Sequence, residues 1–533
     1  MEEKKITFER NAPLGEGAYG SVFRGEFEGR QVAVKRILLN KFNENEEESL
    51  RKLDHPNIIK LFHSESDNDF RTIALELCDA SLEQLFLKSD DPKKYNGPMP
   101  CHIEVFRQLA SGLEYIHLKE LIHRDIKPEN VLISVRSTGR DHEVTIKWAD
   151  FGLSKTVNKR GTCTLSEIKG TKNWLAPETL KWLKNKQSAG ELRGTVQSDV
   201  FVLCLVFCYI LLNGDHLYGS SEHNVGKNIR NGNPINMQKI NDGLRKLYEA
   251  YVLLKMLEDD PNKRITSKEV VKQLSFIKVK LDAKEEELRQ LLRARDFSDA
   301  HILKIKDFTV FGINVNHDDG WRALHCLCRS HSSSNLKDAV EILILLKIDV
   351  NSKDTDGWNA LHYLCRYNSS SQFLDTIKLL IQQSIDLNAK NKFGWNVLHH
   401  LCWNNSNTNF LDAIQLLIQL GVDVNARDKA GRNALLHLCS NNSRSSLIDA
   451  IKLLIHLGID VNAKDNKERN ALHYLCRNSS SSNLQDTVQL LIHHGIRIIS
   501  QGNDALLLLR KNNRIHDKDE ILKLLDQTAL VQS

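Results

Sequence analysis

The segment His123-Arg124-Asp125-Ile126-Lys127-Pro128-Glu129-Asn130, HRDIKPEN, is the most informative stretch of this 533-residue chain. It holds a carboxylate, a lysine and an amide within six residues. A second acidic motif, Asp150-Phe151-Gly152, begins twenty residues after the first one ends. Each motif alone occurs by chance in unrelated sequences, so the information lies in their order and their spacing.

A glycine-rich segment stands upstream of both motifs. Gly15 to Val22 reads GEGAYGSV and fits G-x-G-x-x-G-x-V, and it precedes Val32-Ala33-Val34-Lys35 by the length of a strand. Glycines let the backbone approach phosphate groups without a Cβ in the way. A glycine cluster alone more often marks a turn, but one followed by a lysine-bearing strand predicts a loop that folds over phosphates.

In this order, the motifs resemble those of a protein kinase. The resemblance implies an α+β bilobal fold that binds ATP and Mg²⁺ and transfers the γ-phosphate to a hydroxyl of a protein substrate. Asp125 would be the catalytic base, and Lys127 would stabilise the transferring phosphoryl group. Asn130 and Asp150 would ligate Mg²⁺. A lysine two residues after the catalytic aspartate is typical of serine/threonine kinases.

The nucleotide site of such a kinase is expected around Lys35. This lysine would bind the α- and β-phosphates of ATP and pair with a glutamate on a helix. Glu46 is the preferred partner, and its neighbours Glu47 and Glu48 are the alternatives. The other residues expected to bind ATP in this part of the chain are Leu14, Gly15, Gly17, Gly20, Val22 and Ala33.

The activation segment would run from Asp150 to Ala176-Pro177-Glu178. Arg124, beside the expected base, is typical of kinases switched on by phosphorylation of this segment, because the phosphate pairs with an otherwise unpaired buried cation. The hydroxyls available for that phosphate are those of Thr162, Thr164 and Ser166. Structural roles are expected for Glu178, Asp199 and Arg264.

Several segments are similar to one kinase group, the inositol-requiring kinase/endoribonuclease of the unfolded-protein response together with ribonuclease L. The similar segments include 73–82, 150–155 and 170–178. The resemblance covers roughly residues 8–277. It implies that Leu75 is the gatekeeper and that Glu76 and Cys78 present hinge carbonyl and amide groups to adenine. A homodimer through the kinase domain is one assembly that it implies.

The members of that group carry a helical ribonuclease domain directly behind the kinase. Here a repeat array is expected over residues 305–528, which leaves only the charged helical stretch 278–304 between the domains. That stretch is too short for an independent catalytic core, so ribonuclease activity is not expected. It would be a linker or the N-terminal cap of the array, and the apolar stripe of Leu288, Leu291 and Leu292 favours the cap.

The second half of the chain repeats every 37 residues. The repeated positions are Leu324, Leu361, Leu398, Leu435 and Leu472, and Cys328, Cys365, Cys402, Cys439 and Cys476. Each of the five units runs through a turn, a short helix, a Ser/Asn-rich loop, an amphipathic helix and an extended finger. The order resembles the ankyrin repeat with a lengthened loop, so we expect an all-α solenoid with one shared core. Gly312–Asn316 would end an earlier, degenerate unit, and Ala505–Leu525 would be a polar cap.

The ligand of the array is open at this point. Trp321, Trp358 and Trp395 occupy the same finger position in three consecutive units. They would form a recognition strip for a partner or pack on the neighbouring finger for stability. A protein partner is the expected ligand. An oligonucleotide is the alternative, because the ankyrin repeats of ribonuclease L bind an oligoadenylate and aromatic fingers can stack bases.

The composition agrees with a chain of folded domains. The formal charge of +5 is small for this length and gives no argument for nucleic acid. Five of the eleven cysteines are the repeat position, where small buried thiols fit better than disulfides. The repeat histidines would bond backbone groups between turns. The N-terminus shows no signal peptide and the apolar run 200–212 is too short to span a bilayer, so a cytoplasmic protein without a membrane partner is expected.

Two functions from different classes remain. The first is an active serine/threonine kinase whose ankyrin array recruits a substrate or a regulator. The second is a nucleotide-binding, dimerising scaffold in which the array senses a protein or oligonucleotide ligand and kinase chemistry is vestigial. Intact Lys35, Asp125, Lys127, Asn130 and Asp150 favour the first.

Overall fold

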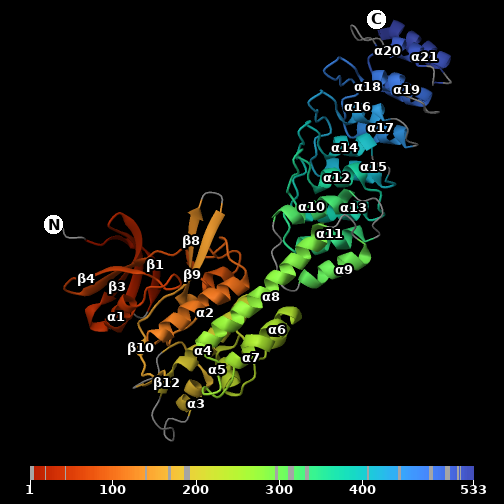
Figure 1. The fold of residues 1–533 in the computed structure, drawn as a ribbon. Helices are drawn as coiled ribbons and strands as arrows, with labels where there is room; N and C mark the ends of the chain where they lie inside the picture. Colours follow the sequence, from red (N-terminus) through yellow and green to blue (C-terminus); the bar gives the residue numbers. More distant parts are fainter. Residues whose placement is uncertain are drawn as a thin grey trace. The chain divides into compact units, whose positions relative to one another are not determined.

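The computed structural model describes residues 5–17, 20–42, 44–138, 141–165, 170–184, 193–293, 298–309, 317–329, 335–404, 407–441, 446–478, 484–498, 505–512, 515 and 518–532. The chain divides into two compact units, Met1–Ala283 and Lys284–Ser533. Figure 1 traces them from the N-terminus in red to the C-terminus in blue.

The first unit begins with a five-stranded antiparallel sheet (Figure 1). Its strands, in spatial order, are β1 (Thr7–Gly17), β2 (Gly20–Phe27), β3 (Arg30–Leu38), β5 (Phe70–Glu76) and β4 (Leu61–Ser66). Val32 and Val34 of β3 lie with Ala74 of β5 in one buried cluster, as the alternation of side chains along a strand requires. Helix α1 (Glu44–Lys52) packs beside β4.

The rest of the first unit is mainly helical. Its helices are α2 (His102–Leu118), α3 (Pro177–Lys184), α4 (Val196–Leu211), α5 (Glu222–Arg230), α6 (Asp242–Tyr248) and α7 (Leu254–Met256). Single 3₁₀ turns occupy Leu39–Lys41, Glu83–Phe86, Pro128–Asn130 and Met237–Lys239, and a π-helical turn occupies Glu249–Leu253. The apolar run of the sequence is α4, whose residues from Asp199 to Cys208 are all buried. None of the helices in the described ranges is long and apolar enough to cross a membrane.

Short strands position the loops between these helices. They form three small sheets: β6 (Ala80–Ser81) with β8 (Val131–Thr138) and β9 (Asp141–Trp148), β7 (Leu121–Ile122) with β10 (Lys155–Thr156), and β11 (Thr162–Thr164) with β12 (Arg193–Thr195). The HRDIKPEN segment follows β7, and Asp150 follows β9. A sheet-rich part followed by a helical part is the α+β bilobal fold that the motifs predict.

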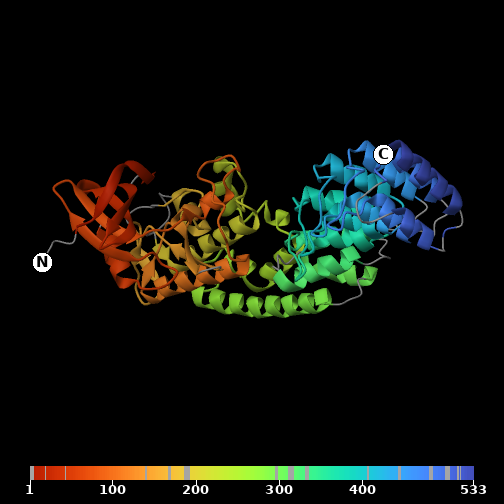
Figure 2. The same cartoon turned by 90° about the horizontal axis from the view of Figure 1, so that it is seen from above.

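The described part of the second unit consists of helices and loops. Helix α8 (Ser267–Arg293) runs through the division between the units, and α9 (Asp299–Phe308) follows it. The inner helices are α10 (His317–Arg329), α12 (Ala360–Tyr367), α14 (Val397–Asn404), α16 (Ala434–Ser440), α18 (Ala471–Asn478) and α20 (Ala505–Lys511). The outer helices are α11 (Leu336–Leu345), α13 (Phe373–Gln382), α15 (Phe410–Gln419), α17 (Leu447–His456), α19 (Leu484–His493) and α21 (Lys518–Gln532). Figure 2 shows them stacked in sequence order.

One continuous hydrophobic core runs through the second unit, and it contains all ten repeated Leu and Cys positions. Burial raises the pKa of the Cys328, Cys365 and Cys439 thiols, and none of the eleven cysteines, all of which the structure describes, forms a disulfide. Leu288 and Leu292, from the end of α8, belong to the same core. Their position supports the interpretation of this stretch as an N-terminal cap of the array.

The inner helices α12, α14 and α16 each follow an asparagine whose side chain caps the helix. In the second unit of the repeat, Asn359 Oδ1 accepts a bond from the His362 amide (3.1 Å), and His362 Nδ1 accepts one from the Asn359 amide (3.0 Å). His362 Nε2 lies 3.1 Å from the Ala389 carbonyl, 27 residues later. The repeat histidines therefore bond backbone groups between turns, as expected, and burial lowers the pKa of His362 to about 4.

The fingers are built by a short acidic or amide side chain. Asp354 Oδ1 accepts bonds from the amides of Asp356 and Trp358, both at 2.8 Å, and Gly357 takes a φ of 82° that a side chain would disfavour. Asparagines then tie successive fingers together. Asn425 Nδ2 donates to the Gly458 carbonyl (2.9 Å), and its Oδ1 accepts from the Asp460 amide (2.7 Å).

The first repeat departs from this pattern, and Trp321 is not on a finger. It lies within helix α10, which starts at His317. The position of the capping asparagine is occupied by Arg322, which lacks the short oxygen acceptor that stops the helix in later units. The sequence prediction for Trp321 is therefore wrong about its backbone, and its side chain lies outside the described residues. Gly312–Asn316 also lie outside them.

Candidate active site

Three segments that are far apart in the sequence bring their charged groups together beside the five-stranded sheet. Lys35 stands on β3, Glu46 on α1, and Asp150 follows β9. Lys35 Nζ lies 2.7 Å from Glu46 Oε1, 2.8 Å from Glu46 Oε2 and 3.0 Å from Asp150 Oδ1. The ammonium group is thus held by two carboxylates, and Glu46 is the helical partner that the sequence favours.

Burial alone would disfavour each of these charges, and their mutual contacts oppose that effect. Burial lowers the pKa of Lys35, but the Glu46 and Asp150 carboxylates outweigh it and the net pKa is raised. Burial alone would raise the pKa of Asp150, yet the Lys35 ammonium holds the pKa of this carboxyl below its ordinary value. The lysine and Asp150 are therefore both charged at neutral pH.

Glu47, an alternative partner in the sequence, has a different set of contacts. Its carboxylate accepts bonds from Arg71 on β5 (2.7 Å), Ser64 on β4 (2.6 Å) and Arg51 on its own helix (2.6 Å). Burial would raise the pKa of Glu47, but these donors lower it to about 2. Glu47 therefore fixes α1 to β4 and β5 and points in a different direction from Glu46, since consecutive helical residues differ by about 100°.

A second contact fixes α1 from the side of the Asp150 motif. Ser49 Oγ lies 2.7 Å from Ser154 Oγ, and Ser154 Oγ also donates to the Phe151 carbonyl (2.7 Å). Both serines are buried. The sequence motifs gave no signal for this pair, because each serine is an ordinary residue until the fold brings the two together.

The HRDIKPEN loop gathers the groups expected to act on the phosphoryl group and its acceptor. Asn130 Nδ2 donates to the Asp125 backbone carbonyl (2.8 Å) and to Asp125 Oδ2 (2.9 Å), and Lys127 Nζ lies 2.9 Å from the same Oδ2. Thr171 Oγ1 donates to Asp125 Oδ1 (3.2 Å) and accepts from Lys127 Nζ (3.0 Å). A hydroxyl thus stands within hydrogen-bond reach of the expected base, which is the geometry that a general base requires.

The backbone of both motifs is held in an unusual conformation. Arg124 has a φ of 70° and Asp150 a φ of 61°, which non-glycine residues seldom adopt. Asp199 stabilises the first of these turns because its carboxylate accepts bonds from the amides of His123 (2.8 Å) and Arg124 (3.1 Å). Burial would raise the pKa of Asp199, but its hydrogen bond with His117 and these contacts lower it. Asp199 therefore has the structural position that the sequence predicts.

The expected hinge follows β5. Leu75 is buried, and its neighbour Glu76 directs its carboxylate to Lys147 (3.1 Å). Burial raises the pKa of the Cys78 thiol to about 12, so this side chain is a neutral thiol. The Glu76 carboxylate is thus paired with a lysine, and the Cys78 side chain is a neutral thiol. Both observations fit a hinge that contacts a ligand through its backbone.

The glycine-rich loop joins β1 to β2, and the described part of it pairs Gly15 with Val22 and Gly17 with Gly20. A Cβ on Gly15 would meet no atom within 4 Å, so this backbone faces open space. A Cβ on Gly20 would lie 2.3 Å from the Arg36 carbonyl oxygen, so only glycine fits there. Leu14 is exposed, Val22 is half-buried and Ala33 is buried.

The donor set fits Mg²⁺ bound together with ATP. Asn130 uses its amide nitrogen for Asp125, which leaves its oxygen as a ligand, and Asp150 contacts Lys35 through Oδ1 alone among the described residues. No cluster of three or more His, Cys, Asp or Glu side chains suited to a metal occurs in the part of the chain that the structure describes. Mg²⁺ commonly binds with one or two protein oxygens plus substrate phosphates, so two ligands suffice here.

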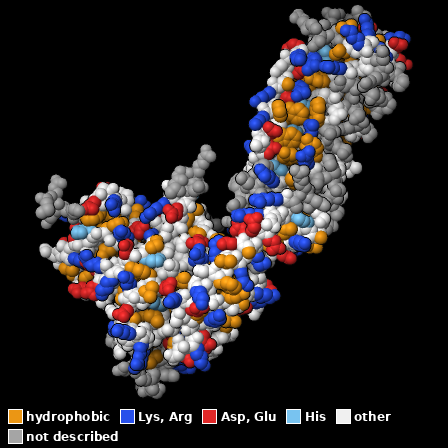
Figure 3. All heavy atoms as spheres, viewed as in Figure 1, with side chains coloured by type: hydrophobic (Ala, Val, Ile, Leu, Met, Phe, Trp, Pro, Cys, Tyr) orange, Lys and Arg blue, Asp and Glu red, His pale blue; other side chains and the backbone are white. Residues whose placement is uncertain are grey.

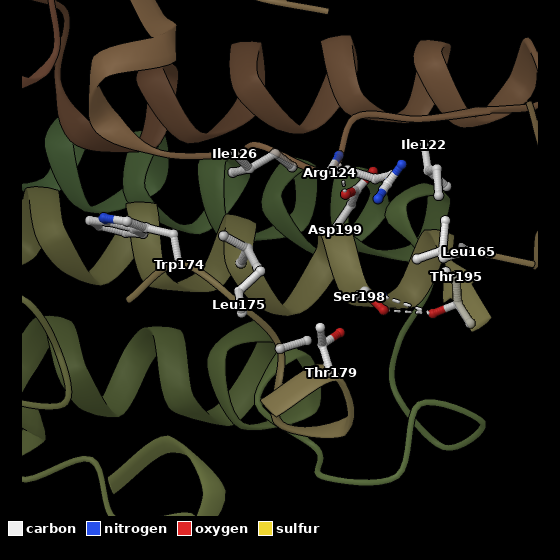
Figure 4. A pocket seen from close by; sticks show the side chains of 13 residues that line it. Ile122, Arg124, Ile126, Leu165, Trp174, Leu175, Thr179, Thr195, Ser198 and Asp199 are labelled. Carbon is white, nitrogen blue, oxygen red and sulfur yellow. Dashed lines mark hydrogen bonds between the residues drawn. The ribbon is translucent and has the colours of Figure 1, made fainter. Parts of the chain in front are cut away.

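The activation segment lies over a small cavity of about 40 Å³, which includes Arg124, Leu165, Trp174 and Asp199 in its lining (Figure 4). Arg124 donates to the Leu153 carbonyl (3.3 Å), so it is not the unpaired cation that the sequence suggested. It is still close enough to Cys163 to influence that thiol electrostatically.

The phosphate candidates stand on and after β11. Thr162 is half-buried and Thr164 is exposed, while Ser166 lies outside the described residues. The segment ends at an ion pair between Glu178 and Arg264 (2.9 Å), as expected for two structural residues.

The candidate binding face of the array combines packing with exposure. The Trp358 ring lies 4.1 Å from that of His400 in the next unit, between centroids, in a tilted arrangement, and the Trp395 ring lies 4.3 Å from that of His437 in an edge-on arrangement. Both tryptophans are half-buried. The indoles of Trp358 and Trp395 therefore pack on the neighbouring unit, which is one of the two alternatives that the sequence left open. Each indole also keeps part of its surface open to a partner.

Comparisons with known proteins match both halves of the chain. The model of the protein kinase domain matches residues 8–276, and that of ankyrin repeats matches 292–391, 331–428 and 398–502. The human serine/threonine-protein kinase/endoribonuclease IRE2 is 35% identical over 310 residues, which cover 54% of this chain and 32% of the relative. The Caenorhabditis elegans serine/threonine-protein kinase/endoribonuclease ire-1 is 36% identical over 236 residues, or 43% of this chain and 23% of the relative. The chain spans about a third or less of these relatives.

Proposed function

Because this chain belongs to the protein kinase family and its motif residues contact one another as phosphoryl transfer requires, we propose that it phosphorylates serine or threonine side chains of proteins with ATP. The observation that carries this proposal is the contact of Lys35 with both Glu46 and Asp150. A lysine held in this way by a helical glutamate, with the aspartate of the second motif beside it, is the arrangement that phosphoryl transfer from ATP requires, and it supports an active site over a vestigial one.

Each residue has a definite part in the reaction. Lys35, held by Glu46, would bind the α- and β-phosphates of ATP. Bound Mg²⁺, on Asn130 and Asp150, would neutralise charge on the phosphates. Asp125 would accept the proton of the substrate hydroxyl. In the same step the hydroxyl oxygen would bond to the γ-phosphorus, and the bond between the γ-phosphorus and ADP would break.

Lys127 is placed to assist the transfer. Its ammonium group lies beside Asp125 and Thr171 at 2.9 and 3.0 Å, where it can stabilise negative charge that develops on the phosphoryl group. Thr171 occupies the position beside Asp125 Oδ1 that an incoming hydroxyl needs. Substrate binding would therefore displace this contact.

The ankyrin array would recruit the protein substrate or a regulator. Half-buried Trp358 and Trp395 support this role, because aromatic side chains with one open face are common centres of protein interfaces. The array needs no chemistry of its own for this task. It raises the local concentration of substrate at the attached kinase domain.

The test is phosphate transfer by the full chain with Mg²⁺ and labelled ATP, with the modified residues mapped by mass spectrometry. Wild type should label itself or a generic substrate on serine or threonine, and the activation-segment hydroxyls Thr162, Thr164 and Ser166 are the expected sites. Asp125→Asn should lower the rate by about 10²- to 10⁴-fold. Asp90→Asn, which removes an exposed carboxylate elsewhere, is the matched control. ATP binding without transfer in the wild type would refute the proposal and favour the nucleotide-gated scaffold.

A further inference from the structure

One position in the last turn of the inner helices carries arginine in three of the five repeats. These residues are Arg329, Arg366 and Arg477, at 37-residue register, and the other two repeats have Trp403 and Ser440 there. The position is on the same helix as the repeat histidine, and in the second repeat it brings Arg366 close to Trp395 on the next finger and Trp403 on the next inner helix. Of the three arginines, Arg366 has the most enclosed surroundings.

The Arg366 guanidinium lies among aromatic rings. Its carbon is 5.6 Å from the centroid of Trp395, 5.7 Å from that of Trp403 and 5.6 Å from that of Tyr367. Nε and Nη1 are buried, and neither has a hydrogen-bond partner among the described residues. The rings attract the cation, but they do not replace hydrogen-bond acceptors for these N–H groups.

The neighbouring finger arginines show what Arg366 lacks. Arg432 pairs with Asp428 at 3.0 Å, and Arg469 pairs with Asp465 at 2.6 Å. In the described part of the chain, Arg366 has no such carboxylate, and the neighbouring Tyr367 acts on it through its charge and a side-chain hydrogen bond. Burial lowers the pKa of Arg366, as expected when no anion compensates a buried cation. An external anion would satisfy both N–H groups.

A second buried donor lies close to Arg366. Asn391 Oδ1 accepts from the amides of Phe393 (2.9 Å) and Trp395 (3.0 Å), which fixes the orientation of its side-chain amide. Asn391 Nδ2 therefore donates to His400 Nε2 (3.2 Å), and the neutral ring carries its proton on Nδ1. That buried nitrogen has no hydrogen-bond partner among the described residues. Arg366 is one of the charges that act on His400.

The fifth repeat has an open counterpart of this site. A hollow of about 240 Å³ is lined by Lys467, Arg469, His473, Tyr474, Arg477 and Leu508. Arg477 stands three repeats after Arg366 at the same position. On the array in Figure 3, hydrophobic side chains gather in patches with Lys and Arg side chains around them.

We propose that the inner-helix face of the array, from Arg366 to Arg477, binds an extended acidic segment of a partner protein. One anionic side chain, a carboxylate or a phosphate, is seated on Arg366 between Trp395 and Trp403, and a second enters the hollow at Arg477. This assignment deepens the recruiting role proposed above and rests on it.

The distribution of charge favours a peptide over a nucleic acid. The cationic sites are separate, and the finger arginines Arg432 and Arg469 are already paired with the buried carboxylates of Asp428 and Asp465. A nucleic-acid strand has a phosphate at every nucleotide and would meet these neutralised arginines, whereas a peptide can place its anions only at Arg366 and Arg477. The aromatic rings then contact its apolar side chains.

The experiment measures fluorescence anisotropy of short labelled peptides with the full chain carrying Asp125→Asn, so that binding is read without catalysis. The probes are a peptide with spaced glutamates, the same peptide with phosphoserines, and an uncharged version with glutamine. Arg366→Gln should weaken binding of the anionic peptides by about tenfold or more, because it removes a buried hydrogen-bonded charge from the complex. Lys378→Gln, on the exposed side of α13 in the same repeat, should change it by less than about twofold.

A further variant, a stability measurement and an oligonucleotide probe make the result unambiguous. Arg366→Lys keeps the charge but loses the two-pronged donor and should bind with intermediate affinity. Thermal unfolding of each variant verifies that the array is folded. Equal binding of the glutamine peptide, or equal binding by Arg366→Gln and wild type, would overturn the proposal. So would a single-stranded oligonucleotide that binds more tightly than both anionic peptides and depends on Arg366. A failure of phosphate transfer would leave these readings unaffected.

Discussion

The two units of the chain form their critical contacts over very different distances in the sequence. In the first unit, Lys35 and Asp150 are 115 residues apart, and Glu178 and Arg264 are 86 apart. In the array, His362 contacts the carbonyl of Ala389, 27 residues later, and Asn425 accepts a bond from the amide of Asp460, 35 residues later. The kinase unit is therefore a single cooperative construction, whereas the array repeats a short-range one.

This difference predicts how far the effect of a substitution should extend in each unit. Neutralising a charged group in the kinase site removes a partner from groups on several distant elements, so function should fail as a whole. Removing a hydrogen bond between two neighbouring repeats of the array affects only those repeats, so the consequence should stay local. Substitutions in both units can test this contrast.

Among the substitutions that compare the two units, the larger effect is expected for Glu46→Gln. The neutral amide would no longer hold the Lys35 ammonium, and a misplaced phosphate-binding lysine should lower kcat/KM for ATP by about 10²-fold. Steady-state kinetics with a peptide substrate measures this change. Glu48→Gln, an exposed neighbour on the same helix, is the control and should retain wild-type kinetics. Equal activity of both variants would show that Glu46 does not position Lys35.

A smaller effect is expected for Asn425→Ala in the array. It removes two bonds between successive repeats and should cost about 1 to 2 kcal/mol of array stability in urea unfolding. Amide exchange should increase in α15 and α17 first. Asn388→Ala is the matched control at the same repeat position, because within the described ranges its exposed side chain makes no bond to the next repeat. Global unfolding or loss of phosphate transfer in Asn425→Ala would contradict local stability.

The sequence predicts the kinase residues whose roles depend on local spacing. Asp125, Lys127 and Asn130 share one short loop, so their grouping needs no knowledge of the fold. The choice between Glu46 and Glu47 does need it, because both stand on one helix and only packing decides which one faces Lys35.

The contact of Ser49 with Ser154 was not predictable in this way. It joins two segments 105 residues apart, and neither serine belongs to a motif that spacing could identify. A resemblance to a family gives the residues that the chemistry requires. It does not give the packing contacts that hold those residues in place.

In the array, the period predicts the core but not the binding face. Leucine and cysteine positions recur because every repeat buries the same side, so one rule covers them all. The surroundings of Arg366 draw rings from two different repeats, Tyr367 and Trp395, at positions that vary along the array. The prediction for Trp321 was wrong for a related reason, because one missing capping asparagine changed the local backbone.

The most direct measurement follows phosphate transfer and array protection together in Asp150→Asn of the full chain. Removing this carboxylate takes away a Mg²⁺ ligand and a partner of Lys35. Labelled ATP should give no detectable transfer, while hydrogen exchange of α12 to α19 should remain that of the wild type. Retained transfer would contradict the assignment of the catalytic metal site. Altered exchange throughout the array would contradict the contrast between a cooperative kinase unit and a locally stabilised array.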